Sequence, residues 1–384
     1  MRIGIVATHS FPIPWATHTG DAQVILDLTA ALLALGHQIT VYAPEGSQLP
    51  AGARLLPMPA SYGKAPPWSW DCEEKCFADH AADLRAEDVV HDFSNTKRIA
   101  EILMAEGRPV VSTLLGGVWA HPYQALNICV WSQAMRQRGL RGATDYEGTP
   151  TPDMGGPPQR PIKDARVVHG GVDTDFYSPG DGGKKGFFLW MNRWHPAKGY
   201  KTAIDLARKM TGLQVVMAGE HPDREMFEYQ RACAHEAVRM ASGLPNVTFE
   251  WLPADPDHHT AKRELYRQAR ALLYTVQFQE PFGLSQVEAL ACGTPVIGTR
   301  FGSVPEVVEH GRTGWVCDNT TEAFAEGCDM VRGFEYGNKV PTFRPVGSSA
   351  DCRESALSRF DRSVMARAYV DCYLDAIAGK GWGA

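Results

Sequence analysis

Two glutamates, Glu280 and Glu288, frame the stretch of this sequence whose residue types most directly suggest chemistry. They enclose Pro-Phe-Gly-Leu-Ser-Gln-Val, in which the proline and glycine break the preceding apolar run and Leu284 begins a helical pattern. The first carboxylate is therefore expected in a loop and the second on a helix. Between them lie backbone N–H groups at a helix N-terminus, where unpaired amides and the helix dipole favour an anion. A ligand that carries both hydroxyls and phosphate, such as a nucleotide sugar, suits this arrangement.

The full string resembles a family signature. Glu280 is followed by Pro-Phe-Gly, and Glu288 is followed by Ala-Leu-Ala-Cys-Gly-Thr-Pro-Val over residues 289–296. This pattern is similar to the donor site of the retaining glycosyltransferases with the GT-B fold, family 4 (glycosyl transferases group 1). The resemblance implies that Glu288 accepts hydrogen bonds from ribose hydroxyls and Glu280 from hydroxyls of the transferred sugar. It also implies that three backbone amides face the donor phosphates, those of Phe282, Gly283 and Leu284.

Two cations follow an expected strand at 187–191. Arg193 and Lys198 lie in Asn-Arg-Trp-His-Pro-Ala-Lys-Gly over residues 192–199. Cations at the carboxyl end of a strand can contact phosphates, Arg in bidentate fashion and Lys as a point charge. From spacing alone they are solvated surface charges, whereas the resemblance implies that both bind the donor diphosphate. In that role they would stabilise the charge that grows on the leaving group, which makes them catalytic candidates together with Glu280.

The first half of the chain matches the family less closely. Gly20, in Thr-Gly-Asp, stands where the family usually has two adjacent glycines near the donor phosphates, although the neighbouring residues could simply cap a helix. The family commonly has Thr-x-His at a strand end, and here the third position is Leu115, two residues after Thr113. His91 and His121 are the candidates to replace the missing histidine. Each could instead be a hydrogen-bonded structural residue.

Composition bounds the class of protein. The chain has 384 residues, 44% of them hydrophobic and 21% charged, and a formal net charge of −6. This balance is ordinary for a soluble protein and argues against a general nucleic-acid binder. No apolar run approaches the roughly 20 residues that span a bilayer, and the apolar start is too short for a secretion signal, so a cytoplasmic location is expected. The nine cysteines show no metal-binding spacing and are expected to be reduced, mostly buried thiols.

The order of elements predicts an α/β protein with the GT-B fold, two Rossmann-like domains facing each other across a cleft. A strand at 2–8, a helix at about 22–35 and a strand at 39–42 form a βαβ unit, and a second alternation begins at Gly186. We predict an acceptor-side domain over 1–180, a donor domain over 181–360, and a terminal helix within 361–384 that crosses back to the first domain. Residues 139–163 read as an irregular, mobile segment over the cleft.

These features together predict a retaining hexosyltransferase that uses a UDP- or GDP-sugar and an acceptor hydroxyl. Because no Asp-x-Asp pair lies at a strand end, we expect no metal and no other cofactor, the nucleotide sugar being a substrate. The resemblance implies that the leaving phosphate itself takes the acceptor proton. A catalytically silent nucleotide-sugar-binding protein and a GT-B nucleotide-sugar epimerase are the alternatives, and a pyridoxal-phosphate phosphorylase would need a longer chain. The sequence names neither the acceptor nor the oligomeric state.

Overall fold

A computed structural model describes residues 1–14, 20–60, 69–114, 127–138, 164–183, 186–222, 228–253, 257–333 and 346–382. His121, Leu115 and the segment 139–163 lie outside these ranges. The described chain divides into two compact units. Unit 1 holds the described residues up to Gly171 and those from Asp361 onward, and unit 2 holds Val172–Phe360. None of the described helices is long and apolar enough to span a membrane.

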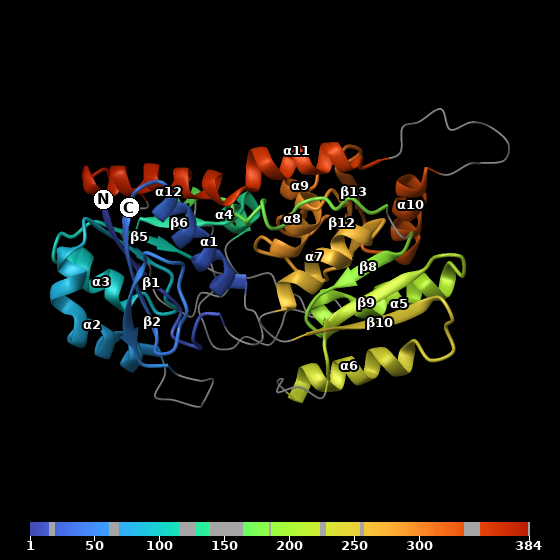
Figure 1. Cartoon of the computed structure of the whole chain (residues 1–384), viewed down its shortest axis with the longest axis horizontal. Coiled ribbons are helices and arrows are strands. Elements are labelled where there is room, and N and C mark those ends of the chain that lie inside the picture. Colours follow the sequence, from blue (N-terminus) through green and yellow to red (C-terminus); the bar gives the residue numbers. More distant parts are fainter. Residues whose placement is uncertain are drawn as a thin grey trace. The chain divides into compact units, whose positions relative to one another are not determined.

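Unit 1 is built on a parallel sheet of buried, apolar strands with the order β3-β2-β1-β4-β5-β6-β7. The strands are β1 (Arg2–Val6), β2 (Gln38–Pro44), β3 (Arg54–Met58), β4 (Val89–Asp92), β5 (Val110–Thr113), β6 (Ile128–Val130) and β7 (Arg166–Val167). The helices are α1 (Gly20–Ala34), α2 (Ser69–Ala86), α3 (Arg98–Ala105), α4 (Gln133–Arg138) and α12 (Arg362–Ile377). Helix α12, red in Figure 1, comes from the end of the sequence and packs against α1, β4 and β5.

Unit 2 repeats this architecture with the strand order β10-β9-β8-β11-β12-β13, again all parallel. The strands are β8 (Phe188–Met191), β9 (Val215–Glu220), β10 (Val247–Leu252), β11 (Ala271–Tyr274), β12 (Val296–Thr299) and β13 (Gly314–Cys317). The helical elements are η1 (Pro196–Lys198), α5 (Tyr200–Lys209), α6 (Glu228–Met240), α7 (His258–Gln268), α8 (Leu284–Ala291), α9 (Val304–Val307), α10 (Thr321–Arg332) and α11 (Ser349–Phe360). Residues 172–180, placed by the sequence in the first domain, pack in unit 2, where the Arg267 guanidinium donates to the Ser178 carbonyl at 2.6 Å.

The two sheets confirm the α/β class and the paired parallel-sheet architecture predicted from the sequence. Their strand order also locates where a ligand would bind. In unit 2 the chain proceeds outward from β8 in one direction to β10 and then returns to β11 on the other side of β8, which makes the β8–β11 boundary a topological switch point. Open parallel sheets bind ligands at the carboxyl ends of the strands at such a point. The segments that follow β8 and β11 contain Lys198 and Glu280.

Candidate functional site

The turn after β8 fixes the backbone of Lys198 against the end of β11. His195 accepts a hydrogen bond from the Ala197 N–H at 3.0 Å, and the Trp190 indole N–H donates to the Lys198 carbonyl at 3.0 Å. Gly199 has φ +74°, and a Cβ there would lie 1.8 Å from the Thr275 carbonyl oxygen. Only glycine therefore permits this close approach of the two segments. The lysine is held at the switch point by its backbone, which leaves its side chain to extend toward the loop after β11.

Lys198 and Glu280 form an ion pair that is almost closed to solvent. The Nζ lies 2.5 Å from Oε2 of Glu280, and the side chains are 12% and 9% exposed. The Tyr274 hydroxyl donates to the same oxygen at 2.9 Å, and the ammonium stands 4.6 Å from the centre of the Phe278 ring. Burial lowers the pKa of Lys198, against the opposing effect of Glu280. Within the described residues Oε1 of Glu280 accepts no hydrogen bond, so this oxygen remains an acceptor for a ligand hydroxyl.

The loop between Glu280 and α8 is shaped by close packing. Gly283 has φ +75°, and a Cβ there would lie 2.2 Å from the Tyr274 hydroxyl. The Phe282 ring is buried and packs edge-on against Phe360, with ring centres 5.9 Å apart. This side chain anchors the loop, so any ligand contact by residue 282 would come from its backbone. Helix α8 begins at Leu284 with no side-chain cap, and the Gln286 N–H donates to the Gly283 carbonyl at 3.2 Å. The amides of Leu284 and Ser285 are the first-turn donors that could face an anion.

Glu288 lies on α8 and is more enclosed than Glu280, with 1% of the residue exposed. Its Oε1 lies 3.0 Å from Nζ of Lys262, and its Oε2 accepts from the Tyr266 hydroxyl at 2.8 Å. Both partners come from α7 and are one helical turn apart. The sequence analysis missed them, although their i, i+4 spacing on a predicted helix is the signal that places both on one face. The carboxylate is thus held from two sides before any ligand binds.

Arg193 completes the basic side of this cluster. It follows β8, and its side chain is exposed; within the described part of the chain no hydrogen bond or ion pair engages it. Its charge contributes to the lowered pKa values of both His195 and Lys198, for which burial is the main cause. Unit 2 therefore holds all four predicted residues, Arg193, Lys198, Glu280 and Glu288; of these, Lys198 bonds to Glu280, and the charge of Arg193 acts on Lys198.

Gly20 and His91, the two candidates in unit 1, have different surroundings. Gly20 is the exposed first residue of α1, and the adjacent Asp21 accepts a hydrogen bond from the Thr8 hydroxyl at 3.1 Å. A phosphate contact at Gly20 stays a prediction.

The catalytic role predicted for His91 requires correction. His91 is fully buried in β4, and its Nδ1 and Nε2 form hydrogen bonds of 2.7 and 2.8 Å with the hydroxyls of Tyr373 and Thr113. Burial and the nearby Lys97 charge hold the pKa of His91 well below 6.5. Neither nitrogen is open to a substrate, so His91 is a neutral, structural residue that ties α12 to the sheet.

Comparison with known proteins agrees with this geometry. Residues 172–331 match the family model for glycosyl transferases group 1. D-inositol 3-phosphate glycosyltransferase of Mycobacterium tuberculosis is 34% identical over 161 residues, which cover 38% of this chain and 32% of the relative. The match thus spans about a third of the curated relative's length.

Solved structures extend the likeness to the fold of the whole chain. AviGT4, a glycosyltransferase involved in avilamycin A biosynthesis, aligns with a TM-score of 0.67 at 23% identity and covers 99% of both chains. Anabaena HepE, solved in complex with UDP and glucose, aligns with a TM-score of 0.65 at 16% identity over 97% of this chain and 98% of that one. The protein described here has the GT-B fold of these glycosyltransferases.

Proposed function

We propose that this protein is a retaining, metal-independent hexosyltransferase that moves a sugar from a UDP- or GDP-sugar to an acceptor hydroxyl. The observation that carries the proposal is the Lys198–Glu280–Tyr274 group at the switch point of unit 2, inside the segment that matches the family model for glycosyl transferases group 1. The curated relative's name supports glycosyl transfer, and the UDP-bound state of the solved neighbour supports a nucleotide-sugar donor.

Each assigned role follows from the chemistry of the group. Glu280 would accept hydrogen bonds from hydroxyls of the transferred sugar through its open Oε1, since a carboxylate has no donor of its own. The ammonium of Lys198 has three donors, of which the described contacts use one, on Glu280. Its other donors, the exposed Arg193 and the amides that begin α8 would stabilise the diphosphate as its negative charge grows.

Glu288 would hold the ribose. The Tyr266 hydroxyl donates to one oxygen of its carboxylate, and Nζ of Lys262 lies within 3.0 Å of both oxygens. An ionised carboxylate has about four acceptor sites. The ribose hydroxyls would use those that remain. This role makes Lys262 and Tyr266 part of the donor site, because they orient the carboxylate that the ribose meets.

In the proposed reaction the bond between the anomeric carbon and the diphosphate oxygen breaks as the acceptor oxygen forms its bond on the same face of the sugar. The acceptor proton passes to the departing phosphate, so the reaction needs no side-chain base. The burial of His91 is consistent with this scheme, because it removes one of the two histidines that were candidates near the sugar.

The test is a thermal-shift and turnover screen of the protein against UDP-, GDP- and ADP-sugars, with and without EDTA. We expect one nucleotide class to raise the Tm and to be released slowly whether or not EDTA is present. The anomeric configuration of the product, read by NMR, tests retention. Stabilisation without release would support a silent binding protein, recovery of an epimeric donor would support an epimerase, and no shift with any donor would contradict the proposal.

A further inference from the structure

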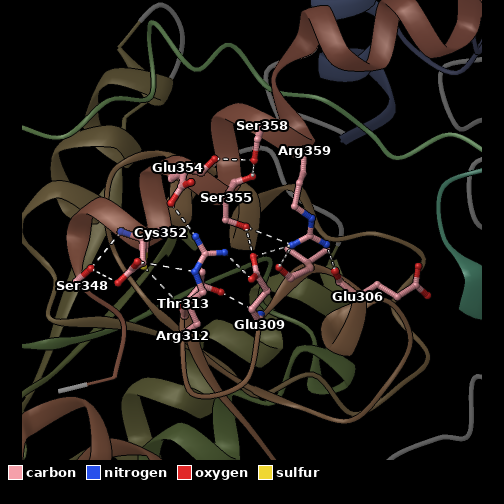
Figure 2. Close-up of polar contacts among 12 residues, drawn as sticks. Glu306, Glu309, Arg312, Thr313, Ser348, Cys352, Glu354, Ser355, Ser358 and Arg359 are labelled. Atoms are coloured by element: carbon pink, nitrogen blue, oxygen red, sulfur yellow. Dashed lines mark hydrogen bonds and ion pairs between the residues drawn. The ribbon is translucent and has the colours of Figure 1, made fainter. Parts of the chain in front are cut away.

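Helix α11 carries two half-buried arginines, Arg353 and Arg359, whose contacts lie outside the candidate site but reach the elements that build it. Figure 2 shows Arg359 within a polar network in which Glu309 lies between Arg359 and Arg312. The carboxylate of Glu309 accepts from Arg359 at 3.3 Å and from Arg312 at 2.6 Å. Most of the other acceptors of Arg353 and Arg359 are backbone carbonyls, and the positions of these carbonyls indicate what the arginines do.

Arg359 caps the carboxyl end of α9. Its guanidinium donates to the carbonyl of Glu306 and to that of Val307, the latter at 3.3 Å. These are the last residues of α9, where helical carbonyls lack partners within the helix and a cation is favoured. At the opposite end of α9, the Ser303 N–H donates to the Glu280 carbonyl at 2.9 Å. The short helix therefore connects Arg359 to the backbone of the carboxylate assigned to the transferred sugar.

Arg353 does the same for α8. One of its nitrogens donates to the carbonyl of Ala291, the last residue of α8, at 3.1 Å. The same nitrogen lies 2.7 and 2.8 Å from the carbonyls of Thr174 and Tyr177, which fixes the guanidinium from the other side. Helix α8 carries Glu288, and its first turn supplies the amides assigned to the diphosphate.

We propose that Arg353 and Arg359 are positioning residues of the donor site. By holding the carboxyl ends of α8 and α9 from one helix, they fix the spacing of Glu280, Glu288 and the first-turn amides of α8. This inference rests on the proposed function, because it assigns the two arginines to the same site. A displacement of about 1 Å in such a constellation can lower a rate by about a hundredfold, so the two arginines act on turnover without touching substrate.

The experiment compares Arg353→Met, Arg359→Met and Arg359→Lys with Arg312→Met. Arg312 is the matched control, because it belongs to the same network but its described bonds go to the carboxylates of Glu309 and Glu354 and not to a helix end. Hydrogen exchange of the ligand-free proteins is measured by mass spectrometry over α8, α9 and, as a reference, α5. We expect the methionine variants to exchange about tenfold faster over the helix that each arginine caps, with α5 unchanged.

Steady-state kinetics then separates positioning from general stability. We expect kcat to fall about 10- to 100-fold in the methionine variants while the Tm changes little, and Arg312→Met to retain wild-type kcat. Arg359→Lys keeps the charge but has no fork to span two carbonyls, so it should recover part of kcat. If Arg359→Met does not fold, Arg359→Lys still tests the role of this arginine.

The outcomes distinguish the two proposals. Unchanged exchange over α8 and α9 overturns the positioning role whatever the enzyme does, and so does faster exchange with unchanged kcat. Where the wild-type protein turns over no nucleotide sugar, the proposed function fails, and with it the assignment of these arginines to a donor site, even where exchange shows that they hold the helices. Faster exchange together with a lower kcat, in a protein that turns over its donor, supports both.

Discussion

Each unit contains a buried lysine paired with a carboxylate, and the two pairs differ in what they leave unsatisfied. Lys97 in unit 1 is 2% exposed, and its ammonium donates to the carbonyls of Asp92 and Thr113, both at 2.9 Å, with the Asp92 carboxylate at 3.7 Å. Lys198 in unit 2 is 12% exposed, and among the described residues its ammonium bonds only to Glu280. An ammonium has three donors, of which the described hydrogen bonds use two in Lys97, which also has a carboxylate at ion-pair distance, and one in Lys198.

The pKa direction does not separate these lysines, because burial lowers the pKa of both. The hydrogen-bond partners around each lysine do separate them. The carboxylate of Asp92 also accepts from the N–H of Ser94 at 2.6 Å, and that of Glu73 accepts from the N–H of Thr96 at 3.0 Å, so the polar groups of unit 1 hold their own loop. The polar groups of unit 2 keep acceptors and donors for a ligand. Donors and acceptors that the protein leaves unused therefore indicate a ligand-binding site better than the burial of a charged side chain does.

Replacing Lys97 with methionine should produce the largest effect on stability. The change leaves the buried carboxylates of Asp92 and Glu73 without their cation, which typically costs about 3–5 kcal/mol of the free energy of unfolding. Urea denaturation measures the loss. Lys75→Met, which removes an exposed ion pair with Asp79, is the control and should leave stability nearly unchanged. A small loss of unfolding free energy in Lys97→Met would contradict the structural role assigned to Lys97.

Replacing Lys198 with methionine should have its main effect on activity. We expect kcat/KM to fall about 10²–10³-fold, as for loss of one group that stabilises charge on a leaving group. Lys201→Met is the matched control, because Lys201 lies on the next helix in an exposed pair with Glu236. Turnover of the donor identified by the screen measures both variants. Equal activity of the two would remove Lys198 from the site.

Acid should weaken unit 1 more than unit 2. His9 is buried with its pKa lowered by burial to about 4, and His91 has its pKa held well below 6.5. In the unfolded chain both histidines gain a proton near pH 6.5, whereas the folded chain keeps them neutral to lower pH. Their contribution to stability is therefore complete above pH 6.5 and is lost as pH falls toward 4. For His9 the loss reaches about 3 kcal/mol at pH 4, at 1.36 kcal/mol per pKa unit. Glu73 opposes this trend, because burial raises its pKa to about 6 and the folded state takes up that proton first.

Hydrogen exchange at pH 7 and pH 5 measures this difference unit by unit. We expect unit 1 peptides to lose more protection than those of unit 2, and His91→Gln, whose amide can still contact two hydroxyls, to reduce the loss. Equal loss of protection in the two units would contradict the assignment of His91 as a buried neutral residue.

Replacing Lys262 with methionine should have the smallest effect of the four. Glu288 would keep Tyr266, so we expect KM for the donor to rise about tenfold with kcat nearly unchanged, as for loss of one hydrogen bond to a charged group. Lys209→Met, an exposed partner of Glu322, should leave KM unchanged. A wild-type KM in Lys262→Met would show that the ribose carboxylate needs no cation from α7.

Much of the candidate site in unit 2 could be predicted from the sequence because its residues lie in short sequence motifs. The break at Pro281 and Gly283 followed by a helical pattern places Glu280 in a loop and Glu288 on α8, and these relations are local. Strand alternation likewise places Arg193 and Lys198 after β8. The partners of Glu288 were missed because the two side chains come from α7, and a propensity pattern does not say which helix face meets which neighbour.

Unit 1 could not be interpreted in this way. His91 stands at a strand end, a position equally suited to catalysis and to structure. Its Nδ1 partner, Tyr373, is 282 residues away on α12. The predicted return of the terminal helix to the first domain does not say which of its side chains meets β4. The hydrogen bond between the Tyr373 hydroxyl and His91 therefore forms only in the tertiary fold.

The sequence by itself determined the α/β class, the two alternating halves and the placing of Glu280 in a loop and Glu288 on a helix, because periodicity and turn residues act over a few positions. The grouping of Arg193 and Lys198 with these glutamates came from the family resemblance. Only the tertiary structure decided which polar groups remain open. Both ring nitrogens of His91 are hydrogen-bonded, one of them to Tyr373 on the distant helix α12, whereas Lys198 and Glu280 meet across 82 positions and keep unused bonding capacity. Hydrogen-bond saturation depends on which segments pack together, and that is a property of the folded chain.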